Sequence, residues 1–270
     1  MNIIGDYHMH TRASDGSGSV QDMVTIALEK GLREIAITDH GLRKIKGLKP
    51  KRLAEYFSEI DSVQEQLTVL VGAELDLING AGALDPAEGL REKCDIILMG
   101  IHILVWYSFR TFFSFLVPNL FYKLIKFTPK WRVRRNTAIV KKCLEQNDVD
   151  IWAHPGRYFK VDVVDVARTC VRKGILIELS GKRVSFRPID FERMIELGAK
   201  FIIGSDAHHP NKIAEVDRVS EFLKNCDYTE DDIINLKRTY SEYKHEQEIS
   251  GRNQERTAPQ QRKSWFKRWF

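Results

Sequence analysis

The sequence predicts an α/β fold in which seven parallel strands form a closed or nearly closed barrel. Two observations predict it: short apolar runs recur seven times, and segments with helical spacing separate them. Strand, helix, strand repeated in this way implies a parallel sheet, and seven such units favour a barrel. The predicted strands are residues 2–8, 34–40, 68–76, 95–102, 149–155, 175–182 and 200–208.

The first helix is predicted directly after the first strand, in the segment SVQDMVTIALEKG at residues 19–31. Ser19 can act as its N-cap, with Asp22 at the N3 position of a capping box. Gly31 stands where a C-cap belongs, because glycine readily adopts the left-handed backbone that ends many helices. Further segments of helical spacing lie between the later strands and continue the alternation.

The composition is that of a globular protein with a sizeable core. Of the 270 residues, 43% are hydrophobic, and the formal net charge of +5 is too small to indicate nucleic-acid binding by itself. No CxxC pair is present, and the N-terminus does not resemble a signal peptide, so we expect a reducing, cytoplasmic compartment. The four scattered cysteines are Cys94, Cys143, Cys170 and Cys226.

Candidate metal ligands stand at the ends of the predicted strands. In a parallel barrel, the C-terminal ends of the strands converge on one face, where functional sites are built. Six of the eight histidines lie at such ends, and every strand except the sixth supplies a candidate. His8 and His10 point to the same side because they are two residues apart on a strand. The nine candidates are His8, His10, Asp15, His40, Glu74, His102, His154, Asp206 and His208.

The chemistry of these candidates indicates which ions they would bind. Imidazole and carboxylate groups without a thiolate suit zinc, manganese or iron. Nine ligands exceed what one ion can use, so the set implies more than one ion. A water held between metal ions loses a proton near neutral pH and becomes a nucleophile. Such a cluster therefore suits the hydrolysis of phosphate esters.

These motifs, taken in order, resemble those of the PHP family, named for polymerase and histidinol phosphatase. The match extends over roughly residues 3–225. It implies a distorted seven-stranded (β/α)7 barrel of the TIM-like type with three divalent metal ions. The motifs are the HxH and SDG of DYHMHTRASDG, the TDH at 38–40, Glu74, the AHP at 153–155 and the SDAH at 205–208.

Carried over residue by residue, the resemblance implies three ion sites, two of which share a carboxylate. Asp15 stands where some relatives carry histidine, and a carboxylate there favours a harder ion such as manganese or iron. No ligand position is vacant, which argues against a merely structural copy of the domain. The implied sets are His8, His10, Glu74 and Asp206 for the first ion; Glu74, His102 and His154 for the second; and Asp15, His40 and His208 for the third.

The resemblance also implies a mechanism. Hydroxide bridging the first two ions would attack a phosphomonoester in line, while the metal ions carry the developing charge. The leaving alkoxide then needs a proton, for which metal-bound water, Asp15 and His208 are the candidates.

Basic residues that follow three of the strands are candidates for binding the phosphate group. Arg157, Arg43 and Arg183 follow the fifth, second and sixth strands, and a guanidinium can grip phosphate oxygens in bidentate fashion. Lys182 is a further candidate beside Arg183. A loop arginine is also commonly a solvated charge.

Other polar residues near the strand ends receive different interpretations. We expect Asp39 to orient a neighbouring ligand rather than to bind metal. Glu178, on the sixth strand, either lines the barrel near the metal ions or pairs with a structural partner. His209 and His245 are interpreted as ordinary surface residues.

Residues 103–135 interrupt the barrel with a long aromatic and then basic insert. A membrane-spanning helix is opposed by Arg110 and Pro118 within the run. It is also opposed because His102 and His154, which must bind one ion, would lie on opposite sides of the membrane. Three roles remain: a lid over the metal site, a homo-oligomer interface, or a peripheral membrane contact. The leading interpretation is a lid that sets substrate choice.

The last part of the sequence is predicted to lie outside the catalytic domain. We expect residues 1–245 to form the domain and residues 246–270 to form a flexible polar linker with an aromatic and basic tip. On a helix, the aromatic residues of 262–270 would share one face and the basic residues would attract anionic lipid. The tip and the insert could thus act together as two membrane signals.

The function predicted first is that of a phosphatase acting on a small phosphomonoester, histidinol phosphate or a related metabolite. A 3′–5′ nuclease or nucleotide phosphoesterase ranks lower, because the basic excess is slight and no polymerase domain is recognisable. A phosphotyrosine-protein phosphatase at the membrane is a third hypothesis. A metal-stabilised interaction module without activity is the fourth.

Overall fold

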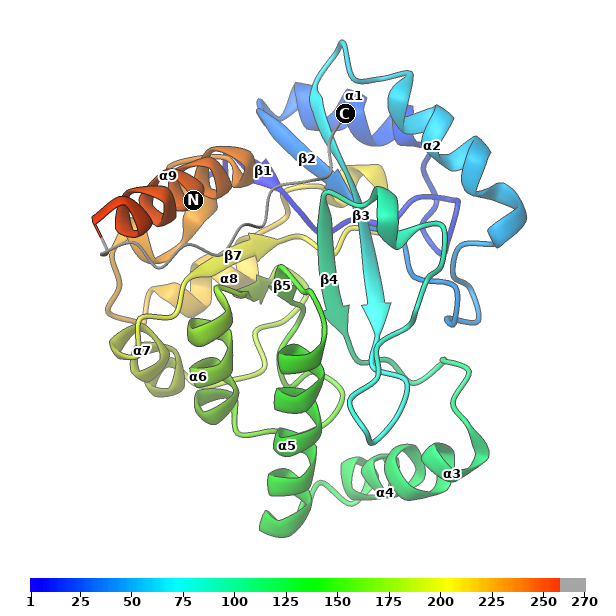
Figure 1. Ribbon diagram of the computed structural model, residues 1–270, viewed down its shortest axis with the longest axis vertical. Coiled ribbons are helices and arrows are strands. Elements are labelled where there is room, and N and C mark those ends of the chain that lie inside the picture. The colour runs from blue at the N-terminus through cyan, green and yellow to red at the C-terminus, as the bar shows by residue number, and fades with distance from the viewer. Residues whose placement is uncertain (258–270) are drawn as a thin grey trace.

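The structure is a computed structural model that describes the backbone of residues 1–257 and the side chains of residues 1–250. Seven parallel strands form one sheet in the order β1 to β7, each hydrogen-bonded to the next (Figure 1). This confirms the predicted seven-stranded (β/α)7 barrel. The strands are β1 Gly5–Asp6, β2 Glu34–Ile37, β3 Thr68–Asp76, β4 Ile96–Gly100, β5 Ile151–Trp152, β6 Leu176–Ser180 and β7 Phe201–Gly204.

Helices connect most of the strands and lie outside the sheet. The β3–β4 connection is the exception: it holds only the short 3₁₀ turn Arg91–Lys93, which makes the barrel irregular. The α-helices are α1 Val20–Glu29, α2 Leu53–Asp61, α3 Phe109–Thr111, α4 Val117–Leu124, α5 Lys130–Gln146, α6 Val163–Lys173, α7 Pro188–Glu196, α8 Asp217–Leu223 and α9 Tyr240–Thr257.

Helix α1 begins and ends as the sequence predicts. The Ser19 side chain accepts a hydrogen bond from the Asp22 backbone N–H, and the Asp22 carboxylate accepts one from the Ser19 N–H, which forms the capping box. Gly31 has a φ of +72°, a left-handed conformation that costs glycine little and stops the helix. The chain then turns back to enter β2 at Glu34.

The sheet has an open seam between β1 and β7, which side chains close at one end. The Asn235 side chain donates to the Gly5 and Ile203 carbonyl oxygens and accepts from the Ile203 N–H. At the other end of the seam, the backbones of Met9 and Ala207 form a single bridge. The chain segments that follow β1 and β7 are therefore joined at the C-terminal end of the sheet.

The insert after β4 is shorter than expected, because α5 begins at Lys130 and takes in the basic residues 130–135 as its first turns. The remainder contains α3, a π-helical turn at Phe112–Leu116, and α4. Figure 1 shows α3 and α4 apart from the sheet, at the end toward which β3 and β4 point.

Helix α9 also differs from the prediction, because it extends to Thr257 and so takes in residues 246–257, which we expected to begin a flexible linker. The predicted tip at 262–270 lies outside the described residues. None of the helices within residues 1–257 combines the length and apolarity that a membrane span requires.

Candidate metal centre

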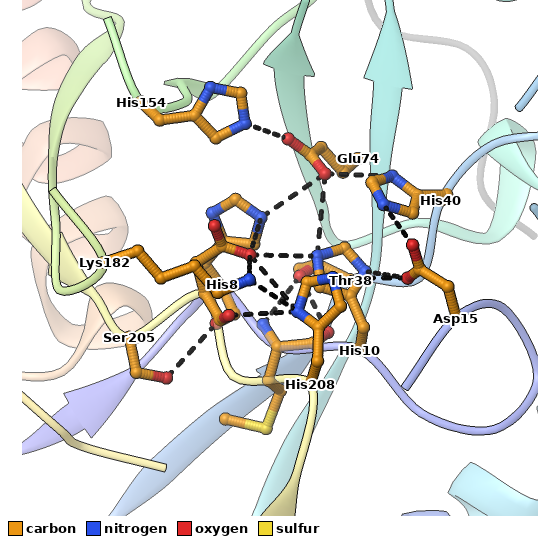
Figure 2. Close-up of polar contacts among 12 residues, drawn as sticks. His8, His10, Asp15, Thr38, His40, Glu74, His154, Lys182, Ser205 and His208 are labelled. Atoms are coloured by element: carbon orange, nitrogen blue, oxygen red, sulfur yellow. Dashed lines mark hydrogen bonds and ion pairs between the residues drawn. The ribbon is translucent and has the colours of Figure 1, made fainter. Parts of the chain in front are cut away.

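The structure brings all nine predicted ligands together at the C-terminal ends of the strands. Figure 2 shows His8, His10, Asp15, His40, Glu74, His154 and His208 among them. Seven of the nine are buried, whereas Asp15 and His208 are partly exposed and mark the mouth of the centre. The side chains within ligand distance of one another fall into overlapping groups. These are His10, Asp15, His40 and His208; His8, His10 and Glu74; His40, Asp76 and His102; and Glu74, His102 and His154.

Glu74, on β3, is the carboxylate that joins these groups. Its Oε1 lies 2.7 Å from Nε2 of His154 and 3.5 Å from Nε2 of His102. Its Oε2 lies 3.4 Å from Nε2 of His8 and 3.6 Å from Nε2 of His10. Oε2 also lies 3.0 Å from Nδ1 of His40. One oxygen therefore faces the ligands after β4 and β5, and the other faces those after β1 and β2, as a bridging carboxylate requires.

Asp206, after β7, completes the first group. Its Oδ1 lies 3.8 Å from Nε2 of His8 and 3.6 Å from Nε2 of His10. These three side chains and Glu74 lie close together, as the first implied ion site requires. The predicted first two sets are thus brought together by β1, β3, β4, β5 and β7.

Asp15 forms the partly exposed side of the centre. Its carboxylate oxygens lie 3.4 Å from Nε2 of His40 and 3.4 Å from Nε2 of His208. Asp39 holds the loop that carries it, because its carboxylate accepts hydrogen bonds from the Thr11 N–H and hydroxyl and from the Ser14 hydroxyl. Asp39 thus orients its neighbours, in the role expected for it.

Two ligands adopt a left-handed backbone that non-glycine residues rarely hold. The φ of His154 is +30° and that of Asp206 is +54°, and such conformations cost about 1–3 kcal/mol each. Specific contacts hold both in place. The Glu178 Oε2 accepts a hydrogen bond of 2.5 Å from the His154 N–H, and Arg157 donates to the Asp206 carboxylate.

Buried polar atoms without partners show that the cluster fits cations. Among the described residues, several ligand atoms in the centre have no hydrogen-bond partner, although an unpaired buried polar atom costs about 1–3 kcal/mol. Positive ions would satisfy all of them at once. These atoms are Nε2 of His8, both ring nitrogens of His10, Oδ1 of Asp15, Nδ1 of His40, Oε2 of Glu74 and Oδ2 of Asp76.

The electrostatics of the centre keep its carboxylates ionised. Burial would raise the pKa of Glu74, but the surrounding histidines, His102 and His8 foremost, hold that pKa well below its usual range. Burial lowers the pKa of His10 well below its usual range, so this ring is neutral and free to bind a metal ion. Burial opposes the charged form of His40, yet Glu74 and Asp15 raise its pKa to about 9. A metal ion therefore competes with a proton at His40.

Two acidic residues position the histidine ligands: Glu178, for which the sequence allowed two roles, and Asp76, which was not among the candidates. Glu178 on β6 accepts from Nδ1 of His8 at 2.6 Å, and Asp76 on β3 accepts from Nδ1 of His102 at 2.7 Å. Both bonds leave Nε2 aimed at the centre. Asp76 could have been found from its spacing, because it lies two residues after Glu74 and so shares its face of the strand.

Glycine at the ends of β4 and β7 makes room for these carboxylates. A Cβ at Gly100 would lie 2.5 Å from Oε1 of Glu74, and one at Gly204 would overlap Oε1 of Glu178. Neither carboxylate could keep its place beside a larger residue. The sequence signal was the glycine that precedes the ligand by two residues in both MGIH and IGSD.

Two of the four basic candidates lie at the centre. Arg157 Nη1 is 2.7 Å from Oδ2 of Asp206, and Lys182 Nζ is 2.9 Å from Oδ1 of the same carboxylate and 2.8 Å from Nδ1 of His208. Arg43 and Arg183 are exposed, and no hydrogen bond or ion pair joins either side chain to any of the nine ligands. His209 and His245 are also exposed, in agreement with their interpretation as surface residues.

We expect Glu178→Gln to lower turnover or metal affinity by about 10- to 100-fold, the usual cost of losing a residue that orients a metal ligand. The amide keeps the size of the side chain but replaces one accepting oxygen with a donor, and this side chain must accept from both His8 and the His154 N–H. Metal titration and turnover of p-nitrophenyl phosphate measure the effect. Glu196→Gln, an exposed change on α7, is the control, and equal behaviour of the two variants would contradict the assigned role.

A parallel barrel whose rim carries this buried imidazole and carboxylate cluster belongs to the class of metal-dependent hydrolases. A family model described as the PHP domain matches residues 6–151, more than half of the chain. The chain therefore belongs to the PHP family. It is a metal-dependent phosphoesterase, in agreement with the resemblance of its motifs.

Relatives and solved structures agree with this assignment. A probable phosphatase of Thermoanaerobacter sp. (strain X514) is 27% identical over 248 residues, which cover 87% of this chain and 91% of that protein. The DNA polymerase/3′-5′ exonuclease PolX of Bacillus subtilis (strain 168) is 29% identical over 221 residues, 77% of this chain but 34% of that protein. Histidinol phosphate phosphatase of Lactococcus lactis, solved with zinc, L-histidinol and phosphate, has the same fold. The TM-score of this structural match is 0.60 at 16% sequence identity, and the match covers 85% of this chain and 95% of the Lactococcus lactis protein.

Proposed function

We propose that this protein is a phosphatase that releases phosphate from a small phosphomonoester of the histidinol phosphate type or a related metabolite. The observation that carries the proposal is the convergence of all nine predicted ligands, with orphaned polar atoms aimed inward and with Arg157 and Lys182 at the mouth. The named phosphatase relative spans nearly the same length as this chain, which supports the same reaction class.

The ligands would hold three divalent ions, of zinc, manganese or iron, in the sets that the family resemblance implies. Ions bound there would lower the pKa of water and neutralise the charge of the transferring phosphoryl group. Glu74 would bind two ions, because its two oxygens face different histidines. Asp15, at the exposed side, would give the third site a harder ligand than histidine.

The chain's own residues at the mouth would bind the phosphate group and assist the leaving group. Arg157 uses one of its nitrogens on Asp206, and a guanidinium has further N–H donors to offer phosphate oxygens. Lys182 lies between Asp206 and His208, where its ammonium can serve the same anion. Burial would raise the pKa of Asp15, but His40, His10 and His208 hold that pKa below its usual range, so Asp15 is ionised and has no proton to give. Of the two partly exposed ligands, His208 is therefore the one that could hand a proton to the leaving oxygen.

The experiment compares substrate classes with the protein loaded separately with zinc, manganese and iron. We expect phosphate release from a panel of small phosphomonoesters, histidinol phosphate included, with kcat/KM at least about tenfold above that for a phosphotyrosyl peptide or for nucleotide release from single-stranded DNA. The His8→Ala, His10→Ala double variant is the control and should be inactive. Faster release of nucleotides would favour the exonuclease alternative, and no hydrolysis with any of the three metals would refute the proposal.

A further inference from the structure

Large apolar side chains are exposed on the insert to a degree that is rare on a protein surface. Phe109 is 82% exposed, Leu124 is 81%, Trp106 is 66% and Phe127 is 62%. So many exposed apolar side chains in one segment indicate an interaction site rather than scattered surface residues. Further exposed apolar residues of the same region are Leu104, Phe112, Phe113, Val117, Phe121, Ile125 and Trp131.

The charged residues of the insert and of a neighbouring segment are all basic. Residues 41–54 and 103–144 contain 15 of the chain's 42 basic residues and none of its 37 acidic ones, so the rest of the chain is acidic. The backbone joins the two segments: Lys44 and Val105 form an antiparallel bridge, and the Ile45 N–H donates to the Leu104 carbonyl. We call the exposed side chains of these two segments the insert surface.

Most of these basic groups are not neutralised. Arg52 pairs with Glu55 and Lys141 pairs with Asp165. Most of the other basic residues make no ion pair with any of the described residues. They are Arg43, Lys46, Lys51, Arg110, Lys126, Lys130, Arg134, Arg135 and Lys142. The insert surface thus presents aromatic rings with free cations around them.

The opposite side of the insert is fixed to the barrel. Phe115 is buried and its ring meets that of Phe159 edge-on, at 5.2 Å between centroids. Asn119 on α4 and Asn136 on α5 exchange two side-chain hydrogen bonds, at 2.8 and 3.2 Å. These buried contacts hold α4 in place, so the exposed rings belong to a supported surface.

Few contacts join the insert to the metal centre, and the lid over that centre stays a prediction. No hydrogen bond or ion pair joins α3 or α4 to any of the nine ligands. Elsewhere in the insert, the Tyr107 hydroxyl donates to the His102 carbonyl oxygen at 2.6 Å. Helix α4 reaches the centre only indirectly: the Lys123 ammonium lies 5.3 Å from the Tyr158 ring, which packs against His102 and His154. The insert therefore lies beside the metal centre, and its large apolar side chains are exposed.

We propose that the insert surface docks on an anionic lipid bilayer. Exposed aromatic and aliphatic side chains flanked by unpaired lysine and arginine are the combination that enters the headgroup region of acidic membranes. A second copy of this chain is a poorer occupant, because two such surfaces would bring the same positive charge together. Docking would also place the metal centre near the lipid, since the two segments start directly after His40 and His102.

The test is sedimentation of the full chain with vesicles of phosphatidylcholine alone and of equal parts phosphatidylcholine and phosphatidylserine. We expect binding to the anionic vesicles only, weakening as salt is raised. Phe109→Ser with Leu124→Ser should reduce the partition coefficient about a hundredfold, because each side chain loses its burial in lipid. Lys126→Glu with Lys130→Glu should reduce it at least about tenfold.

Matched variants elsewhere on the barrel serve as controls. Leu28→Ser with Ile189→Ser removes two exposed apolar side chains, and Arg168→Glu with Lys173→Glu reverses two exposed charges on α6. Neither pair should change vesicle binding, and hydrolysis of p-nitrophenyl phosphate without vesicles should be unchanged in all four variants.

Three outcomes would overturn the proposal, and none depends on the substrate. One is that the full chain binds neither kind of vesicle. Another is that the insert variants bind as the unaltered chain does, which would assign binding to a different part of the chain. The third is a dimer in sedimentation velocity that Phe109→Ser with Leu124→Ser dissociates, which would assign the surface to a second copy.

Discussion

Replacing Glu74 with glutamine is expected to abolish most of the activity, lowering kcat/KM for a phosphomonoester by about 10³-fold. Glu74 lies within 3.6 Å of five histidines that follow β1, β2, β4 and β5, and its two oxygens face different groups of them. The amide keeps the shape but loses the charge and one accepting oxygen. Breaking a buried charge pair costs about 3–5 kcal/mol, which corresponds to a loss of this size.

The measurement combines steady-state turnover with metal analysis of the purified variant. We expect Glu74→Gln to contain fewer metal ions than the unaltered protein, and circular dichroism should show that the barrel still folds. Glu65→Gln, an exposed change before β3, should leave both quantities unchanged. If Glu74→Gln kept its metal ions and lost less than about tenfold in rate, the bridging role would be wrong.

Removing the metal ions is expected to lower both activity and thermal stability. The ligands His8 and His10 come from the chain after β1 and Asp206 from the chain after β7, so ions bound between them would tie together strands that share one backbone bridge. Ligand at a thousandfold excess over its Kd stabilises a fold by about 4 kcal/mol. For a domain of this size, a chelator should therefore lower Tm by about 10 °C.

Calorimetry with and without a chelator measures this shift, and adding back zinc, manganese or iron should reverse it. The His8→Ala, His10→Ala variant should show a much smaller shift, because the first site is already lost. Asn235→Ala provides the matched control, since it opens the other end of the same seam and should lower Tm equally in both forms. A chelated protein that melts at the same temperature as the loaded one would show that the ions do not close the barrel.

The sequence predicts the barrel and the positions of the ligands because both depend on local patterns. Apolar runs mark each strand, and a ligand at the end of a strand must lie on the rim of a parallel barrel. The nine candidate metal ligands lie close together in the structure because each stands at or just after the end of a strand. The capping box at Ser19 was equally predictable, since its two partners are three residues apart.

Features that depend on contacts between distant segments were not predictable in this way. Glu178 meets His8 across the barrel, and Asn235 joins β1 to β7, yet neither residue has a local pattern that names its partner. Arg43 and Arg183 satisfied the same sequence criterion as Arg157, but loop geometry brings only Arg157 to the centre. The start of α5 at Lys130 was missed because aromatic and basic residues suit a loop and a helix alike.

The seam between β1 and β7 also bears on how the protein is made. Ribosomes deliver the N-terminus first, so His8 and His10 leave the exit tunnel long before Asp206 and His208. Until β7 emerges, the nascent chain carries histidines and carboxylates that are buried only in the complete barrel. The complete set of ligands can therefore form only after the last strand has been synthesised, when Asp206 and His208 join those of the earlier strands.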